Sequence, residues 1–464
     1  MPLKPPRLLI QSLRLQIVEN RVMNRTQPAR FACFATLTAL LSALAVFPPL
    51  AAGQAATSAS AAAPRPVQTV PGMPDVRNAA NLYSEVGANQ FSAAVAGALV
   101  RVYVPNRAEN TVSVIDPATL KVVGKFKVGV NPQHIVPSWN LKTLWVANNA
   151  EGRTDGSLTP IDPGTGQPGA SIAVDDPYNV YFTPDGTLAI IVAEAYKRLD
   201  FRDPQSMALR YSIPTPDCDG INHADFSIDG RVAVFTCEFN GAVTKIDLVN
   251  KRVLAMLTVS KYFDRPEFAA ANASAVASGK PYARAKPPSA KASQSIAELC
   301  LTKGMPQDVR ASPDGKTFFI ADMMADGVHV VDLETFRQIG FINTGVGAHG
   351  LYPSRDGKQL YVANRGTNLI RGKPGGKGSV SVIDFASRAV STTWPVPGGG
   401  SPDMGNVSAD GSYLWLSGRF DDVVYRFDTR SGAVDKVKVG REPHGLTVWP
   451  QPGRYSLGHT GNLR

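Results

Sequence analysis

Short apolar runs separated by glycine- and proline-marked turns follow one another along most of the chain. Typical runs are LYVAN at 360–364 and VSVID at 112–116 and 380–384, in which apolar and polar positions alternate. Alternation of this kind predicts half-buried β-strands. The 41 glycines and 36 prolines are spread between these runs and are not gathered in one block. The pattern therefore predicts an all-β chain with many turns.

Two sequence marks repeat along the chain and define a structural unit. A turn of the form Ser/Thr-x-Asp-Gly, sometimes decayed, recurs with spacings of 45, 44, 85, 42 and 54, at Ser138, Thr183, Ser227, Ser312, Ser354 and Ser408. An alternating run that ends in aspartate recurs with spacings of 46, 41, 44, 85, 52 and 44, at Asp116, Asp162, Asp203, Asp247, Asp332, Asp384 and Asp428. Both spacings widen to 85 at the same place, so one unit carries an insertion of about forty residues.

Each unit reads as four short antiparallel strands, and seven such units predict a seven-bladed β-propeller. The pattern begins at Arg101 with a second-strand sequence, RVYVPN, and ends with an inner-strand sequence, PHGLTVWP. We therefore expect the propeller to span 101–450, with the C-terminal segment 443–449 serving as the inner strand of the first blade.

Composition and charge narrow the class of protein. With 464 residues, 44% hydrophobic and 19% charged, the chain is long enough to bury a core and is not a disordered tail protein. The net charge is +10, but residues 1–52 hold six of the 48 basic residues and one of the 38 acidic ones, which leaves +5 for the remainder. We expect no nucleic-acid partner for a chain so nearly balanced.

The N-terminal segment has the organisation of a signal peptide. An uncharged apolar run at 31–47 follows Arg25 and Arg30 and precedes small residues. We expect a leader at 1–55, cleaved between residues 52 and 63. Met23 would be a more usual start for it, so 1–22 can lie outside the true protein. An uncleaved membrane anchor is the alternative. Cleavage predicts a periplasmic or secreted protein with no stable membrane span. We also expect the protein to be a monomer.

Three segments fall outside the repeats. Residues 56–100 are expected to form a linker and an N-terminal extension. The insertion at 261–299 is rich in Ala, Ser, Pro and Lys, which predicts a solvated loop, with a partner-docking arm as the alternative. The tail at 451–464, which contains His459, is expected either to cover the lower mouth of the channel or to fray.

Alignment of the inner strands on their turns brings polar residues into two registers. His134 and His223 share one register with Asn179 and Asp308, while His349 and His444 fall next to it, as does Asp403. These residues begin inner strands and should ring one mouth of the channel, where loops add Arg107, Arg365 and Arg419. The candidate ligand-binding set is therefore His134, His223, His349, His444, Asn179, Asp308, Asp403, Arg107, Arg365 and Arg419.

The three cysteines beyond the leader also belong to that face. Cys218 and Cys300 precede successive inner strands, and Cys237 ends a second strand. We expect a disulfide between Cys218 and Cys300 that ties adjacent blades together, as an oxidising compartment would allow.

The residue types at this mouth suit an anionic ligand, a haem-like cofactor or a soft metal. The mouth can also be polar for structural reasons alone, because the starts of the inner strands expose backbone groups. The sequence holds no Ser-His-Asp order, HExxH motif, EF-hand loop or P-loop. Binding is therefore favoured over catalysis.

Several repeat motifs resemble those of a known family. LWVAN at 144–148, LYVAN, VSVID, SPDGK and PHGL resemble the YVTN-type seven-bladed propellers of the YncE-like family, over roughly 101–450. This resemblance implies a scaffold that binds a ligand or a protein partner.

A more distant similarity is to the d-type haem propeller of periplasmic nitrite reductase. It implies a haem- or metal-dependent oxidoreductase or a cofactor-tailoring protein that uses the channel-mouth histidines. The chain has no CxxCH motif for a c-type haem and so is no self-contained reductase of that type. A lactonase-like hydrolase is the third alternative, and it would need more carboxylates than Asp308 and Asp403.

Overall fold

The computed structural model describes residues 66–151, 153, 155–264, 304–459 and 461–464. The chain divides into two units, residues 1–62 and 63–464, and only the second contains described residues. The predicted leader, most of the 261–299 insertion and Cys300 lie outside the described part.

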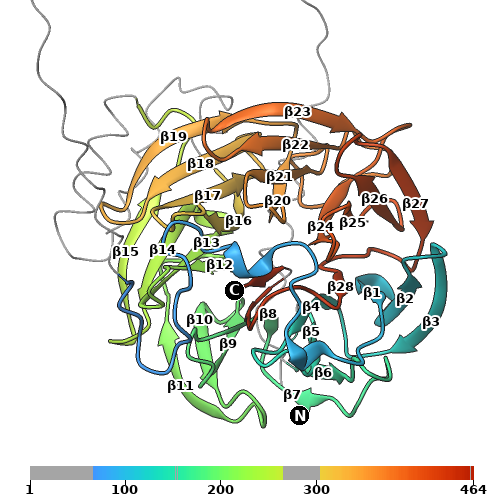
Figure 1. Cartoon of the computed structure of the whole chain (residues 1–464), viewed down its shortest axis with the longest axis horizontal. Helices are drawn as coiled ribbons and strands as arrows, with labels where there is room; N and C mark the ends of the chain where they lie inside the picture. Colours follow the sequence, from blue (N-terminus) through green and yellow to red (C-terminus); the bar gives the residue numbers. More distant parts are fainter. Residues whose placement is uncertain (1–65, 152, 154, 265–303, 460) are drawn as a thin grey trace, which may run out of the picture. The chain divides into compact units, whose positions relative to one another are not determined.

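Seven antiparallel sheets form a ring in the second unit, as the repeats predict (Figure 1). From the inner to the outer strand, the first three blades are β28 (Thr447–Trp449), β1 (Arg101–Asn106), β2 (Thr111–Asp116) and β3 (Lys121–Lys127); β4 (Pro132–Pro137), β5 (Leu144–Asn148), β6 (Ser157–Ile161) and β7 (Ile172–Ala173); and β8 (Pro177–Phe182), β9 (Ala189–Ala193), β10 (Arg198–Arg202) and β11 (Leu209–Pro214).

The fourth and fifth blades flank the insertion. They are β12 (Ile221–Phe226), β13 (Val232–Cys237), β14 (Ala242–Asp247) and β15 (Arg252–Thr258); and β16 (Pro306–Ala311), β17 (Thr317–Asp322), β18 (Gly327–Asp332) and β19 (Arg337–Asn343).

The sixth and seventh blades complete the ring. They are β20 (Ala348–Pro353), β21 (Gln359–Asn364), β22 (Ser379–Asp384) and β23 (Ala389–Pro395); and β24 (Pro402–Val407), β25 (Tyr413–Gly418), β26 (Val423–Asp428) and β27 (Val434–Lys438). The helices of the described chain are four short 3₁₀ turns, η1 (Ser84–Val86), η2 (Ala93–Val95), η3 (Arg107–Glu109) and η4 (Glu238–Asn240). No helix in the described ranges has the length and apolar character needed to cross a membrane.

The ring closes inside the first blade. Strand β28 pairs with β1, with Val448 opposite Val102, so one C-terminal strand completes three N-terminal ones. This confirms the expectation that 443–449 supplies the inner strand of that blade. The closing strand itself is shorter than expected, because residues 443–445 form only isolated bridges.

The recurring Ser-x-Asp-Gly turns are built by side-chain hydrogen bonds. In the fifth blade the Ser312 hydroxyl donates to Asp314 (2.5 Å), whose carboxylate accepts from the Lys316 backbone N–H (3.1 Å). Gly315 follows with φ +67°, a left-handed conformation that favours glycine. The motif therefore marks the point where six of the seven inner strands end, all except β28.

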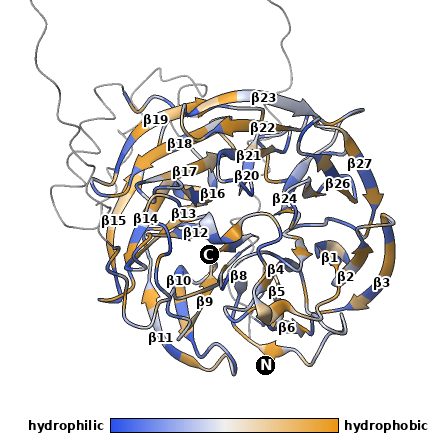
Figure 2. Cartoon of the chain, in the orientation of Figure 1, coloured by the Kyte–Doolittle hydropathy of each residue, from blue (hydrophilic) through white to orange (hydrophobic). Residues whose placement is uncertain are grey.

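The core lies within and between the blades. Each blade buries apolar residues of its middle strands, for example Val234 in β13, Ile320 in β17 and Val362 in β21. Figure 2 shows the corresponding hydrophobic stretches along the strands. Outer strands are more exposed, as the alternation of β23 indicates.

The third sheet departs from the predicted four-stranded blade. The C-terminal tail forms β29 (Ser456–Gly458) and β30 (Asn462–Leu463), and β29 pairs with the inner strand β8 to make a six-stranded sheet. Gly458 lies opposite Tyr181, and a Cβ at this position would lie within 2.4 Å of that residue's backbone. The described residues of the tail thus form a two-stranded hairpin inside the ring (Figure 1).

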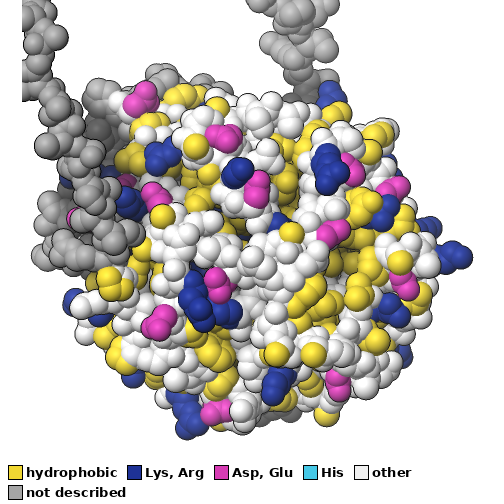
Figure 3. Space-filling view, viewed as in Figure 1, with side chains coloured by type: hydrophobic (Ala, Val, Ile, Leu, Met, Phe, Trp, Pro, Cys, Tyr) yellow, Lys and Arg dark blue, Asp and Glu magenta, His cyan; other side chains and the backbone are white. Residues whose placement is uncertain are grey.

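The tail and the N-terminal extension meet on one face of the ring. We call this face, where the inner strands end, the lower mouth, and the face where they begin the upper mouth. Phe91 bridges Gly453, and the Leu82 N–H donates to the Pro313 carbonyl (2.7 Å). Figure 3 views the ring as Figure 1 does and shows charged side chains of both signs scattered over that surface.

The disulfide differs from the predicted pairing. Cys218 bonds Cys237, with their Cα atoms 4.9 Å apart, and Cys300 lies outside the described residues. The expected Cys218–Cys300 bond is therefore wrong. Cys218 precedes β12, and Cys237 ends β13, the neighbouring strand of the same blade. The antiparallel pairing of Ile221 with Cys237 brings these two ends together, so the bond closes one blade and does not join two.

Candidate functional site

Two successive positions at the starts of the inner strands form two layers across the channel. The upper layer contains Gln133, Tyr178, Asn222, Gln307, His349, Asp403 and His444. The deep layer contains the next residues, His134, Asn179, His223, Asp308, Gly350, Met404 and Gly445. Six of the seven inner strands are irregular in register at this point, from β4 to β24. Such bulges re-aim side chains. In the remaining blade, His444 precedes β28 and contacts both His349 and His134.

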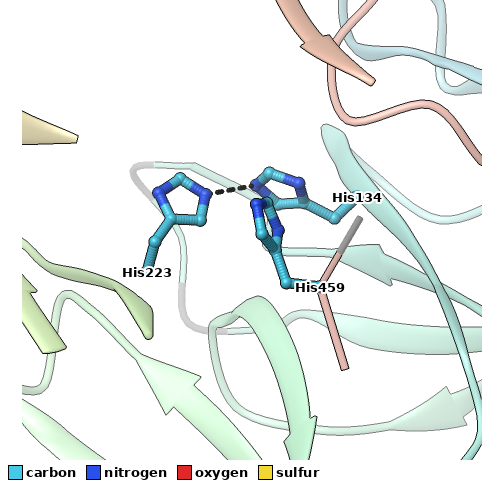
Figure 4. Close-up of side chains that lie close together, drawn as sticks. All are labelled: His134, His223 and His459. Atoms are coloured by element: carbon cyan, nitrogen blue, oxygen red, sulfur yellow. Dashed lines mark hydrogen bonds between the residues drawn. The ribbon is translucent and has the colours of Figure 1, made fainter. Parts of the chain in front are cut away.

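Three imidazoles converge in the deep layer. His134 and His223 come from the second and fourth blades, so they meet across the channel, with their Nε2 atoms 3.4 Å apart. The third ring, His459, comes from the tail, and its centroid lies 4.4 Å from that of His223 and 5.2 Å from that of His134. One nitrogen from each ring lies within 4.8 Å of the others (Figure 4). All three side chains are fully buried.

The hydrogen bonds of His223 fix its proton. Its Nδ1 lies 2.7 Å from the Gln307 backbone carbonyl, which can only accept. Nδ1 therefore carries the proton, and in the neutral ring the lone pair of Nε2 is directed at His134. The proton of the neutral His444 ring is likewise on Nδ1, because this atom lies 3.1 Å from the Gln133 carbonyl.

The upper layer is organised around one buried carboxylate. Asp403 lies 2.8 Å from Nδ1 of His349, 3.7 Å from Nε of Arg365 and 3.8 Å from Nη1 of Arg419. His349 and Arg365 contact Oδ1 of Asp403, whereas Arg419 contacts Oδ2, which also lies 3.7 Å from Nε2 of His444. Arg365 also lies over the Phe420 ring, at 4.9 Å. Two guanidinium groups thus share one carboxylate.

Burial affects the pKa values of the channel histidines and of Asp403 differently. Burial lowers the pKa values of His134, His223, His459 and His444 well below that of a free imidazole, and the neighbouring cationic groups add to this effect. Burial also lowers the pKa of His349, against the pull of Asp403. For Asp403, burial alone would raise the pKa, but Arg365 and His349 outweigh it and hold the pKa well below its usual range. The imidazoles are therefore neutral around an ionised carboxylate.

The remaining predicted site residues have structural partners. Asn179 donates from Nδ2 to Nδ1 of His459 (3.0 Å). Asp308 accepts from the N–H groups of Val309 and Leu351 and from Arg310. Among the described residues Arg107 pairs with glutamates instead of Asp403: it donates to Glu442 (2.6 Å) and has Glu151 as a second partner.

The deep layer fits a metal ion better than a haem-like group. Its three rings have centroids 4.4 to 5.2 Å apart and are in contact, which leaves no room for a porphyrin between them. Three neutral imidazoles are a common ligand set for transition-metal ions.

Sequence reasoning places nine of the ten candidate residues in or beside the two layers, and it misses His459. That histidine lies in the tail, outside the repeat, so no register assigns it to the channel. The signal that could find it is the density of polar residues in 454–464, which also hold Arg464. Glu238 is also missed, since it is buried beside Asn222 (2.9 Å) only through the η4 turn.

Solved structures share the fold of this chain. A functionally unknown protein from Desulfotomaculum acetoxidans is 13% identical, with a TM-score of 0.53 and coverage of 75% of this chain and 98% of that one. The dihydro-heme d1 dehydrogenase NirN in complex with DHE is 14% identical, with a TM-score of 0.50 and 75% coverage of both chains. A putative 6-phosphogluconolactonase from Bacteroides uniformis is 16% identical, with a TM-score of 0.50 and coverage of 75% and 99%.

Sequence comparison identifies the family. No curated protein matches the chain at a significant level. Residues 69–204 and 288–452, however, match the sequence profile of one family along most of the propeller and on both sides of the insertion. The chain belongs to the YNCE-like beta-propeller family.

Proposed function

We propose that this protein is an exported binding propeller that takes a small anionic ligand at the upper mouth of its channel. The observation that carries the proposal is an imbalance of charge in the upper layer. Arg365 and Arg419 are both largely buried beside Asp403, which leaves one positive charge in excess among these three groups. Buried charges are normally paired, so an anion would complete the set.

Unsatisfied donors point the same way. Within the described part of the chain, Nη2 of Arg365 and Nε of Arg419 have no hydrogen-bond acceptor. Guanidinium groups bind carboxylates and phosphates through paired N–H donors, which favours an oxyanion as the ligand. The neutral His349 and His444 rings beside them would add contacts without adding charge.

Export is supported by the disulfide. The Cys218–Cys237 bond is typical of periplasmic and secreted proteins and is rare in the cytosol. The predicted leader lies outside the described residues, and determination of the N-terminus of the mature protein tests it. A first residue between 52 and 63 is expected, and an intact N-terminus on the protein recovered from its native cells would contradict export by this route.

Calorimetric titration tests the anionic ligand. We expect the mature protein to bind at least one of phosphate, acetate or citrate, and we expect Arg365→Gln and Arg419→Gln to weaken that binding by at least about tenfold, the loss of one charge-assisted hydrogen bond. Arg153→Gln is the matched control, because Arg153 is exposed and pairs with Asp155. Equal binding by all four proteins, or no binding of any anion, would contradict the proposal.

A haem-like ligand is the second candidate. NirN, solved in complex with DHE, shares the propeller fold, and His349 and His444 lie in the layer nearer the mouth. Carboxylates on such a ligand could meet the two arginines. An absorption spectrum of the protein purified from its native compartment tests this, since a Soret band that is lost in His349→Ala would favour haem and a colourless protein would exclude it.

A further inference from the structure

We propose that His134, His223 and His459 together bind one transition-metal ion, and that the C-terminal tail completes the site by supplying the third ligand. This site lies in the deep layer, below the groups assigned to the anion. It is therefore independent of the proposed anionic ligand.

The spacing of the nitrogens fits a single ion. Two nitrogens bound to one tetrahedral zinc ion at about 2.1 Å each lie about 3.4 Å apart. The Nε2 atoms of His134 and His223 are separated by 3.4 Å. A ring nitrogen of His459 lies within 4.8 Å of both, so a small movement of one ring closes the triad.

The surroundings orient the ligands. The Gln307 carbonyl holds the proton of His223 on Nδ1 and leaves Nε2 with its lone pair toward the centre of the triad. A backbone carbonyl on the second nitrogen is the usual partner of a metal-bound histidine. His459 contacts Asn179 through Nδ1 and lies 3.6 Å from Asp308 through Nε2, so an ion would replace one of these contacts.

The close packing of the His134 ring requires a glycine at position 445. A Cβ at Gly445 would lie 2.0 Å from Nδ1 of His134. Nδ1 has no hydrogen-bond partner among the described residues, so the position of this ring is set by packing. In the metal-free protein Nε2–H of His134 can donate to Nε2 of His223, and a bound ion would take the place of this proton between the two nitrogens.

The tail links the site to the fold. The hairpin that carries His459 is fixed below it, where Arg464 and Asn462 donate to Asp225 (2.7 and 3.1 Å). A bound ion would join the second blade, the fourth blade and the tail at one point. Metal binding should therefore stabilise the docked tail, by the general linkage between ligand binding and folding.

The ligand set defines the class of ion. Imidazole suits Zn²⁺, Co²⁺, Ni²⁺ and Cu²⁺, whereas Ca²⁺ and Mg²⁺ prefer oxygen ligands. Three protein ligands also leave a coordination position for water or another small ligand, as in open zinc sites.

The experiment is a titration of the metal-free mature protein with Co²⁺, followed by visible absorption and by thermal unfolding, with zinc competition. We expect one Co²⁺ per chain, a ligand-field absorption band and a higher Tm. His134→Gln, His223→Gln and His459→Gln should each weaken binding by at least about 100-fold, more than the loss of an outer contact costs. His329→Gln is the matched control, since His329 is equally buried but contacts Asp322 and Gln338 in the fifth blade.

The outcomes separate this proposal from the other. Loss of Co²⁺ binding in the three triad variants, with one ion retained by His329→Gln and by Arg365→Gln, supports the metal site. No Co²⁺ binding by the wild-type protein overturns it, as does equal binding by all variants, which would indicate surface sites. Circular dichroism confirms that each variant is folded. Anion binding by Arg365→Gln and metal binding by His459→Gln report on separate layers, so either proposal can fail alone.

Discussion

The two halves of the channel are built from similar residues and use them differently. In the lower half, Asp225 accepts hydrogen bonds from Arg464, Asn462 and two backbone N–H groups, one of them from the neighbouring blade. In the upper half, Asp403 lies 2.8 Å from the neutral His349 ring, while its two arginine partners, Arg365 and Arg419, lie beyond hydrogen-bond distance at 3.7 and 3.8 Å. Saturated hydrogen bonding indicates a structural role, and unsatisfied buried groups indicate a place for a ligand. The difference separates the part that holds the C-terminal tail in place from the part for which we propose ligand binding.

The largest effect is expected in the lower half. Asp225→Ala removes the acceptor of the Ala311 N–H and of Nη2 of Arg464, together with one of the two acceptors of Asn462 Nδ2, so we expect unfolding to require about 3 to 5 kcal/mol less. Chemical denaturation measures this change. Asp435→Ala is the control, because Asp435 forms an exposed pair with Arg426 and should cost less than about 1 kcal/mol. Similar losses in both variants would break the comparison.

A drop in pH should destabilise the folded protein through the buried histidines of the channel. The five channel histidines have lowered pKa values in the folded protein, so below pH about 6.5 the unfolded chain binds more protons than the folded one. Stability of the metal-free protein is therefore fully present above that pH and falls as the pH drops, by up to about 1.4 kcal/mol per pH unit for each histidine. Denaturation between pH 7.5 and 5 measures the slope.

A single substitution sharpens the acid prediction. His444→Gln removes one of the five groups whose pKa burial lowers, so the slope below pH 6.5 should become shallower by about one histidine's share. An unchanged slope in this variant, or a flat profile in the wild-type protein, would contradict the assignment of neutral buried imidazoles.

A smaller effect tests the packing between the layers. Gly445→Ala should push the His134 ring and lower stability by about 1 to 3 kcal/mol, as overpacking does. It should also weaken Co²⁺ binding. Gly124→Ala is the control, because its nearest neighbour, Val114, would be 3.7 Å from the new Cβ. A Gly445→Ala protein as stable as Gly124→Ala would show that His134 is not held by shape.

Much of the fold could be predicted because the architecture of a propeller is determined by its repeat. Strand order, blade number and closure by 443–449 depend on spacings that recur, and β28 completes the first blade as expected. The tail does not repeat, so the pattern could not place it beside β8. For the same reason the sequence gives no register for His459, although it does for His134 and His223.

The disulfide shows another limit of the sequence. Cys218 and Cys237 were expected on one face, and Cys300 lies outside the described residues, but the choice of partner depends on which chain ends lie side by side. Pairing of Ile221 with Cys237 brings Cys218 within 4.9 Å, measured between Cα atoms, of its true partner.

The most direct measurement of the central claim is a crystal structure of the Co²⁺-soaked protein with anomalous diffraction at the cobalt edge. The account predicts one strong anomalous peak in the deep layer, at about 2.0 to 2.2 Å from a nitrogen of each of His134, His223 and His459. Anomalous peaks only on the surface, with the three imidazoles unchanged, would contradict it.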